Sequence, residues 1–227
     1  MAGFSGYLHA DAYSGYNALY KPTSAAAPAI THVACMAHAR RKFFEVFDET
    51  ASPIAERALR HIQALYAIEA EIVGQTAEQR WEIRQVRSKP LLQAMHNWCE
   101  AQRRRVSKKT GLGKAFGYAL ARWDALSRYV DDGRLSIDNN LAERLLRGIA
   151  ISRKNFLFLG SDAGGARAAV IYTLAESAKL NGLDPERYLA VVLDRLARGH
   201  TIDRLAELLP WEITLPDVVT ISANNAA

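Results

Sequence analysis

The hydrophobic positions of this chain form two short extended runs near its start and helical repeats over most of the remainder. Residues 7–10, YLHA, are followed by a segment that Gly15 and Pro22 interrupt. Residues 30–35, ITHVAC, contain three β-branched side chains. Short apolar runs bounded by glycine and proline predict two β-strands here.

Helical spacing begins directly after the second run. In residues 36–50, MAHARRKFFEVFDET, the phenylalanines recur at the spacing of a helix. Beyond Ser52 the chain is almost wholly helical, with Pro53 suited to an early helix position. The periodicity of this block predicts one helix from Pro53 through Ile68 and three more, over 77–86, 90–105 and 113–129.

The remaining sequence predicts further helices with recognisable ends. Ser136 or Asp138 can cap a helix through NNLAERLLRGIAI, and Gly182 can stop a later one. The later helices are expected over 166–180, 185–197 and 202–209. The polar residues after Trp211 are expected to fray.

The charge balance is basic. The chain has 29 Lys and Arg against 24 Asp and Glu, a net charge of +5, which favours a polyanionic partner, although a merely soluble basic surface explains it equally well. Two cysteines cannot form a disulfide framework, and no signal peptide is recognisable. No apolar run approaches the roughly 20 residues of a membrane span. We therefore expect a cytoplasmic protein without a membrane partner.

Asp11 and Glu143 are the candidate pair of functional carboxylates. Asp11 follows the first predicted strand, and Glu143 lies in the first turns of the helix that opens with Asp138. Carboxylates gathered at a strand end can hold Mg²⁺ or Mn²⁺, which prefer oxygen ligands. A structural alternative stays open, in which Glu143 pairs with Arg147 one turn along and Asp11 caps a turn.

Basic residues surround both carboxylates in the sequence, and they are the candidate DNA contacts: Arg40, Arg41, Lys42, Arg144, Arg147, Arg153 and Lys154, with His38 close by. Arginine forks and lysine charges suit phosphates. Taken singly, the basic residues at 40–42 and those at 144–154 are each also typical of a solvated helix face. The run RRRVSKK, 103–109, is either a solvated linker or a DNA backbone contact.

Two further stretches offer weaker alternatives. HVACMAH places His32, Cys35 and His38 at three-residue intervals, but structural zinc needs four ligands and no second pair stands at suitable spacing. GSDAGG, 160–165, could present backbone N–H groups to a phosphate, yet it lacks the Lys-Ser/Thr ending of a P-loop, and Ser161 or Asp162 acting as a helix cap is the favoured interpretation.

Several long stretches resemble the transposases of the insertion sequence 66 family. They are LHADAYSGYNALY, ACMAHARRKFFE, IDNNLAERLLRGIAISRKNFLFLGSDAGGARAA, and LNGLDPERYL followed by DRLAELLPWE. Their order covers nearly the whole chain.

The resemblance implies an α/β fold: a partial ribonuclease H-like core with a large helical insertion and a helical C-terminal region. The expected domains are the incomplete N-terminal part of the catalytic core, the insertion, the rest of the core with the glutamate helix, a helical C-terminal domain and a flexible tail, at 1–51, 52–134, 135–180, 181–212 and 213–227.

The resemblance also implies a DDE-type site, in which two aspartates and a glutamate hold two Mg²⁺ or Mn²⁺ ions for DNA strand cleavage and strand transfer. Asp11 matches the second aspartate of the family and Glu143 matches its glutamate. Transposon ends and target DNA are then the partners. Accessory proteins of the same element and a homo-oligomer are further implied partners.

The first aspartate of the family has no match, because none of the ten residues before Asp11 is acidic. Asp48, Asp131 and Asp138 do not correspond to it. We therefore expect a chain truncated at the N-terminus that is inactive or weakly active by itself. The alternative is a transposase remnant that binds DNA or a partner without catalysis.

Overall fold

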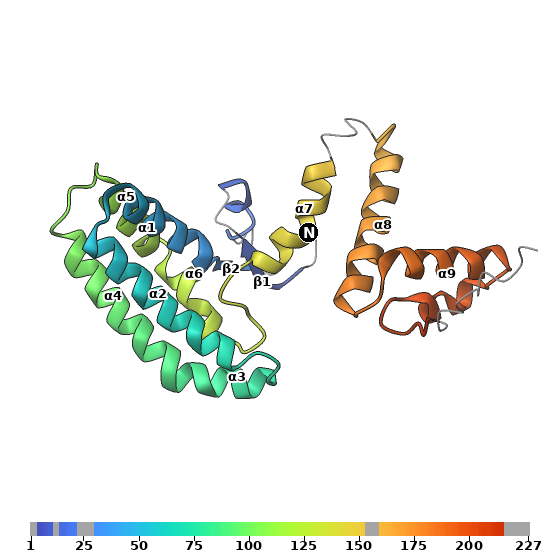
Figure 1. Cartoon of the computed structure of the whole chain (residues 1–227), viewed down its shortest axis with the longest axis horizontal. Coiled ribbons are helices and arrows are strands. Elements are labelled where there is room, and N and C mark those ends of the chain that lie inside the picture. Colours follow the sequence, from blue (N-terminus) through green and yellow to red (C-terminus); the bar gives the residue numbers. More distant parts are fainter. Residues whose placement is uncertain (1–3, 11–13, 22–29, 153–158, 216–227) are drawn as a thin grey trace, which may run out of the picture. The chain divides into compact units, whose positions relative to one another are not determined.

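The computed structural model describes residues 4–10, 14–21, 30–152 and 159–215 (Figure 1). The chain divides into two units, Met1–Glu143 and Arg144–Ala227. Each unit is described by itself below. The division into domains that the sequence predicts at 51, 134, 180 and 212 stays a prediction.

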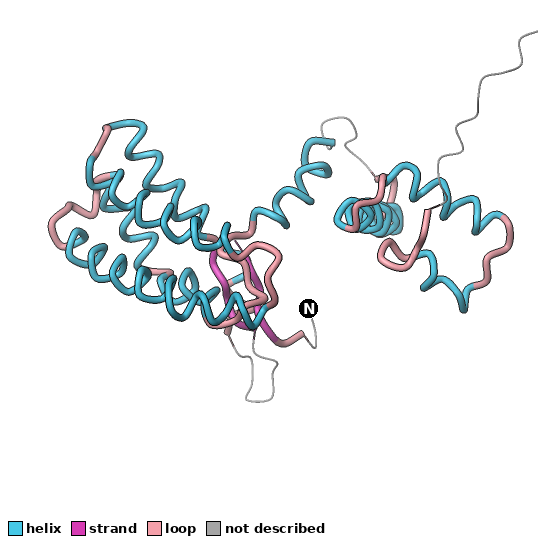
Figure 2. Tube along the Cα trace, turned by 60° about the horizontal axis from the view of Figure 1, so that its bottom comes forward, coloured by secondary structure: helices cyan, strands magenta, loops and turns pink. Residues whose placement is uncertain are grey.

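The first unit contains a two-stranded parallel sheet, drawn in magenta in Figure 2. Strand β1 (Gly6–Ala10) pairs with β2 (Ile30–Ala34) so that Gly6 lies opposite Ile30 and Ala10 opposite Ala34. Both predicted strands are therefore confirmed. Since the strands are parallel, their carboxyl ends lie at the same edge. A single 3₁₀ turn, η1 (Ser14–Tyr16), follows β1 in the sequence.

Helix α1 (Met36–Thr50) starts where β2 ends, as the phenylalanine spacing predicts. Its buried stripe is Met36, Ala39, Phe43 and Val46, and it ends at Ala51 in the left-handed region with φ 49°. Helix α2 (Pro53–Glu71) follows at once, because the Ser52 hydroxyl accepts the Ala55 N–H at 3.4 Å and Pro53 occupies the first turn.

Two separately predicted helices are continuous in the structure. Helix α3 (Ala77–Ile83) runs through a π-helical turn, η2 (Arg84–Ser88), into α4 (Lys89–Arg103). The expected break before Pro90 is thus wrong. At the wide turn the Lys89 N–H donates to the Arg84 carbonyl five residues back, so the ladder shifts immediately before the proline that has no N–H to donate.

A second correction concerns the helix predicted over 113–129. The structure has α5 (Gly111–Leu120), α6 (Trp123–Ser127) and the 3₁₀ turn η3 (Arg128–Val130) in its place. The break lies at Arg122, whose φ of −122° and ψ of 15° leave the helical region. Neither glycine nor proline marks this point, so only packing can set it. After the break Ala125, Leu126 and Tyr129 enter the core.

The core of the first unit lies among α1, α2, α4 and α5, which pack on one another, while α6 contacts β2. The Phe43 and Phe116 rings meet edge to face with centroids 5.2 Å apart, and Trp98 lies 5.6 Å from Phe116. Fully burying one large apolar side chain contributes about 1.5–3 kcal/mol. This helical core therefore gives the two-stranded sheet most of its support.

Helix α7 (Asn140–Ser152) starts in the first unit, and the second unit contains α8 (Asp162–Leu180), α9 (Pro185–Ala197) and the 3₁₀ segment η4 (Ile202–Leu208). The predicted cap is confirmed, since the Ser161 hydroxyl accepts the Gly164 N–H at 3.1 Å, but the helix starts four residues earlier than 166. Gly182, with φ 74°, ends α8 as predicted.

A small cluster of Ala178, Tyr188, Leu208 and Ile213 holds the second unit together, and the Tyr188 hydroxyl donates to the Leu208 carbonyl at 2.9 Å. The fraying predicted after Trp211 is wrong at Ile213, which is buried because it packs in this cluster. Residues 216–227 lie outside the described residues.

The described residues are thus mostly helical with a small parallel sheet, a mixed α/β arrangement. The ribonuclease H-like core stays a prediction. Among these residues no helix combines the length and the apolar character needed to cross a membrane.

Candidate functional site

The segment before α7 is held against the carboxyl end of β2. The Met36 N–H donates to the Ile137 carbonyl at 3.1 Å, and the Asn139 N–H donates to Cys35 Sγ at 3.3 Å. Ile137 is buried in the same core as α1. These contacts join parts of the chain more than 100 residues apart in the sequence. They bring the first turn of α7 to the sheet edge.

Asp138 shapes the start of α7. Its carboxylate accepts the Asn140 N–H at 3.1 Å, the Asn140 side-chain amide at 2.8 Å and the Tyr66 hydroxyl at 2.8 Å. Burial, and then the bond to Asp138, raises the pKa of Tyr66. Of the two predicted caps, Asp138 is the one in place. Its oxygens are engaged with the fold, so it is a structural carboxylate.

Arg84 fixes the loop that leads to α7. Its side chain is fully buried and binds both oxygens of Glu69, at 2.8 and 2.6 Å. It also donates to the carbonyls of Tyr129, Asp132 and Leu135, at 2.9, 3.2 and 2.9 Å. Hydrophobic periodicity could not identify this residue, because Arg80, Arg87 and Ser88, which are among its neighbours at helical spacing, are polar.

Three potential ligands meet at this sheet edge. One ligand atom each from Cys35, His38 and Glu143 lies within 4.8 Å of the others. His38 Nδ1 is 3.7 Å from Glu143 Oε1. Both of these atoms are buried, and neither has a hydrogen-bond partner among the described residues. Burial raises the pKa of the Cys35 thiol, and the N–H of Asn139 partly opposes that shift.

The histidine-cysteine trio considered for zinc is not the one that the fold assembles. His32 lies on β2 and stacks on Tyr20 with ring centroids 4.5 Å apart. In the described part of the chain, Glu143 takes its place beside Cys35 and His38. Sequence spacing could not find this set, because Glu143 is 105 residues beyond His38.

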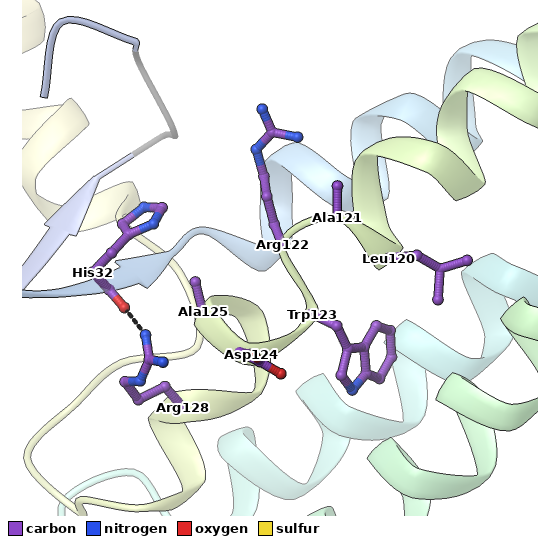
Figure 3. A pocket seen from close by; sticks show the side chains of 8 residues that line it. All are labelled: His32, Leu120, Ala121, Arg122, Trp123, Asp124, Ala125 and Arg128. Carbon is purple, nitrogen blue, oxygen red and sulfur yellow. Dashed lines mark hydrogen bonds between the residues drawn. The ribbon is translucent and has the colours of Figure 1, made fainter. Parts of the chain in front are cut away.

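His32 instead borders a separate pocket of about 240 Å³, which Figure 3 shows. Arg122, Trp123 and Arg128 also line it, and the Arg128 guanidinium donates to the His32 carbonyl. Burial, and then the charge of Arg128, lowers the pKa of His32. None of the predicted site residues that the structure describes lines this pocket.

Some of the predicted site residues lie within the described part of the chain and others do not. Asp11, Arg153 and Lys154 lie outside the described residues. The residue before Asp11, Ala10, is buried and pairs with Ala34, which precedes Cys35. Within the described ion pairs Glu143 contacts His38, and not Arg147 as the structural alternative would have it.

The described basic candidates are exposed: Arg40, Arg41 and Lys42 on α1, and Arg144 and Arg147 on α7. Lys42 pairs with Glu45 at 3.2 Å, and the Arg40 guanidinium lies 5.6 Å from the Phe44 ring centre. In the run 103–109, Arg104, Arg105, Lys108 and Lys109 are exposed around the end of α4. Their DNA contacts stay predictions.

Comparison with known families decides the relationship. A family model described as "Transposase IS66 family" matches residues 1–167, and one described as "IS66 C-terminal element" matches residues 173–211. The chain belongs to the IS66 transposase family. The resemblance stated from the sequence is thereby confirmed.

Curated relatives in the IS66 comparison come from Sinorhizobium fredii (strain NBRC 101917 / NGR234). The chain is 40% identical to uncharacterized protein y4hP over 233 residues, covering 97% of this chain and 42% of that protein. It is 40% identical to uncharacterized protein y4jD over 213 residues, covering 93% and 42%. The chain thus spans about two fifths of the length of these relatives. No solved structure matches it.

The residues at the carboxyl edge of the sheet in this IS66 family chain fit a divalent cation, which DDE transposases generally use. Glu143 Oε1 is a buried carboxylate oxygen without a hydrogen-bond donor among the described residues. Buried polar atoms are nearly always paired, so an oxygen of this kind favours a cation partner.

Proposed function

We propose that this chain carries two carboxylates of a DDE-type transposase centre, Asp11 and Glu143, which serves DNA strand cleavage and strand transfer. The observation that carries the proposal is the buried Glu143 oxygen, which has no hydrogen-bond partner among the described residues, at the carboxyl edge of two parallel strands. Asp11 directly follows the strand that pairs with β2. Family membership supports the same role.

A ribonuclease H-like core with a helical insertion is part of the proposal. In open α/β sheets, functional side chains gather beyond the carboxyl ends of the strands. The parallel pairing of β1 and β2, the crossover between them and a glutamate helix anchored at that edge support this core. The helices α2 to α6 lie between β2 and α7 in the sequence and form the insertion.

The chain's own residues would do the following work. Asp11 and Glu143 would supply anionic oxygens to Mg²⁺ or Mn²⁺, two ions in a complete site, which when bound provide Lewis-acid activation for phosphoryl transfer. Asp138, held by Tyr66 and Asn140, would fix the start of α7 and so the position of Glu143.

The exposed basic residues would hold the DNA backbone. Arg40, Arg41 and Lys42 lie between the buried residues Ala39 and Phe43 of α1, and Arg144 and Arg147 follow Glu143. We add Arg153 and Lys154 from the sequence. Arginine forks bind phosphate oxygens in pairs, whereas lysine contributes a point charge. Binding should weaken steeply with salt because phosphate contacts release counterions.

The first aspartate of the family has no counterpart in the 227 residues. We therefore expect this chain to bind metal and DNA, and strand transfer to need a protein that also carries that aspartate. Accessory proteins of the same element and self-association stay expectations that follow from the family.

Mn²⁺ titration followed by electron paramagnetic resonance tests the carboxylates without requiring activity. Asp11→Asn and Glu143→Gln should each weaken Mn²⁺ binding at least tenfold, while both variants keep the affinity for duplex DNA that is measured in a chelator. Glu45→Gln is the matched control, since Glu45 is an exposed carboxylate on α1 that pairs with Lys42. Unchanged Mn²⁺ affinity in both variants would overturn the proposal.

A second candidate function is DNA binding without catalysis, which the exposed arginines of α1 and α7 favour. In that case the wild-type chain binds DNA with the same affinity in Mn²⁺ and in a chelator, and Glu143→Gln changes neither value. A metal-dependent gain in DNA affinity that Glu143→Gln removes would exclude it.

A further inference from the structure

We propose that Cys35, His38 and Glu143 form a distinct site for a thiophilic divalent cation of the Zn²⁺ class. The site itself stands on the geometry of these three residues. Its functional consequence rests on the proposed function, because Glu143 would be shared with the Mg²⁺ or Mn²⁺ site.

The spacing of the three ligand atoms suits a small cation. Zinc binds sulfur at about 2.3 Å and nitrogen or oxygen at about 2.0–2.2 Å, so neighbouring ligand atoms of a tetrahedral site lie about 3.3–3.8 Å apart. The His38 Nδ1 to Glu143 Oε1 distance of 3.7 Å is already in that range. All three atoms lie within 4.8 Å of one another, so small side-chain rotations complete the set.

Two of the atoms are buried polar groups without a hydrogen-bond partner. His38 Nδ1 and Glu143 Oε1 face each other at 3.7 Å, which is too long for a hydrogen bond, and neither atom has another hydrogen-bond partner within the described part of the chain. Native structures leave few such atoms unpaired, and an ion is one of the groups that satisfies them. A cation between them would pair both at once.

The donor types select the kind of cation. Mg²⁺ and Mn²⁺ favour oxygen ligands, whereas a thiolate, an imidazole and a carboxylate together suit Zn²⁺ or Co²⁺. The Asn139 N–H, 3.3 Å from Cys35 Sγ, provides the outer hydrogen bond that would stabilise a thiolate. Three protein ligands leave one coordination position open, as in zinc sites that exchange water.

The ligands also sit on well-fixed backbone. Cys35 is the extended residue between β2 and α1, and His38 lies in the first turn of α1. Glu143 lies in the first turn of α7, whose approach is tied to α1 by the bond from Met36 to Ile137. A site built on anchored elements loses little freedom when it binds an ion.

The consequence for the proposed DNA chemistry is competition for Glu143. A thiophilic cation bound by Cys35 and His38 would withdraw the Glu143 carboxylate from Mg²⁺ or Mn²⁺. Zn²⁺ should therefore lower Mn²⁺ affinity in the wild-type chain and have little effect on it in His38→Ala.

Co²⁺ titration of the full 227-residue chain is the experiment, because cobalt bound to a thiolate gives a sulfur-to-metal charge-transfer band. We expect the band to saturate at one equivalent and to disappear when Zn²⁺ is added. Cys35→Ala should abolish it. Cys99→Ala is the matched control, since Cys99 is the other buried cysteine and lies in α4, and that variant should keep the band.

Glu143→Gln and His38→Ala should weaken Co²⁺ binding at least tenfold, with circular dichroism used to verify that each variant is folded. A folded wild-type chain without the band would overturn the site, and so would a band that survives Cys35→Ala.

The two proposals fail separately. Asp11→Asn should weaken Mn²⁺ binding and leave the cobalt band intact. Cys35→Ala should abolish the cobalt band and leave Mn²⁺ binding intact. If Asp11→Asn leaves Mn²⁺ affinity unchanged while the cobalt band behaves as expected, the proposed function fails and the Cys35 site stands.

Discussion

Arg84 binds Glu69 through two parallel hydrogen bonds, Nε to Oε1 at 2.8 Å and Nη2 to Oε2 at 2.6 Å, on the inner side of the helical layer. The guanidinium is fully buried, and its remaining donors reach three carbonyls of the segment 129–135. The π-helical turn that places Arg84 therefore braces the loop through which the chain returns to the sheet edge. In this way the helices between β2 and α7 in the sequence contribute to the position of Glu143.

Breaking this pair should be costly. Glu69→Gln leaves the Arg84 charge buried without its partner, and removing one member of a buried pair costs about 3–5 kcal/mol. Urea unfolding followed by circular dichroism measures the loss. Arg87→Gln is the control, since Arg87 and Glu71 form an exposed pair next to it. An exposed pair contributes about 0–1 kcal/mol, so equal losses in the two variants would contradict the assignment.

Tyr66→Phe tests the support of Asp138. The change removes one charge-assisted hydrogen bond and no apolar atoms, and such bonds contribute about 1.5–3 kcal/mol. We expect a loss of stability in that range, together with weaker Mn²⁺ binding because the start of α7 becomes less fixed. The same urea unfolding and electron paramagnetic resonance measurements on Tyr7→Phe provide the comparison, since Tyr7 is an exposed residue of β1. Unchanged stability would mean that Asp138 finds its partners without Tyr66.

Periodicity predicted these elements unevenly, and the reasons are physical. Both strands and α9 were predictable because the short apolar run before Gly15, the β-branched run of β2 and Asp184-Pro185 are local signals. The continuity of α3 with α4 was not, because Pro90 normally marks a boundary and only a shifted hydrogen bond at Lys89 lets the helix continue. The break at Arg122 depends on burial of residues that follow it.

In the candidate site, too, residues with local sequence signals were predictable and residues brought together only by the fold were not. Glu143 was identified from its helix context and the resemblance, both of which are local in the sequence. Its neighbours Cys35 and His38 required the fold, since the bond from Asn139 to Cys35 links positions 104 residues apart. Spacing rules for metal sites search nearby residues and therefore proposed His32 in the place of Glu143.

The Cys99 thiol should make stability depend on pH in alkaline solution. Burial, and then the charge of Glu100, raises the pKa of this thiol to about 12, well above its ordinary value. A raised pKa means that the folded state binds the thiol proton more tightly than the unfolded state does. The contribution of Cys99 to the free energy of unfolding is therefore complete below about pH 9 and is lost as the pH rises toward 12. Native Cys99 should also resist thiol reagents until the chain unfolds.

The measurement compares the free energy of unfolding of wild type and Cys99→Ala between pH 8.5 and 10.5. The slope of wild type should be more negative, by an amount approaching 1.4 kcal/mol per pH unit, about the value for one proton. Parallel slopes would show that Cys99 ionises alike in the folded and unfolded states. Subtracting the variant removes the contributions of Tyr66 and Tyr129, whose pKa values burial also raises.

DNA affinity should depend on α1 through its exposed arginines. Under the proposed function, Arg40 and Arg41 neutralise backbone phosphates, and each lost phosphate contact lowers the slope of log K against log salt by about 0.9. The double variant Arg40→Gln and Arg41→Gln should therefore bind duplex DNA more weakly and with a slope smaller by up to about 1.8, whatever the DNA sequence.

Arg60→Gln is the matched control for charge removal, because Arg60 is exposed on α2 and already pairs with Glu56 at 2.5 Å. Fluorescence anisotropy over a salt series gives both slopes. If Arg60→Gln reduces the slope by half as much as the double variant does, each lost charge counts alike, and binding follows net charge and not the α1 surface. A reduction confined to Arg40 and Arg41 means that DNA lies along α1, on the helix that also carries His38.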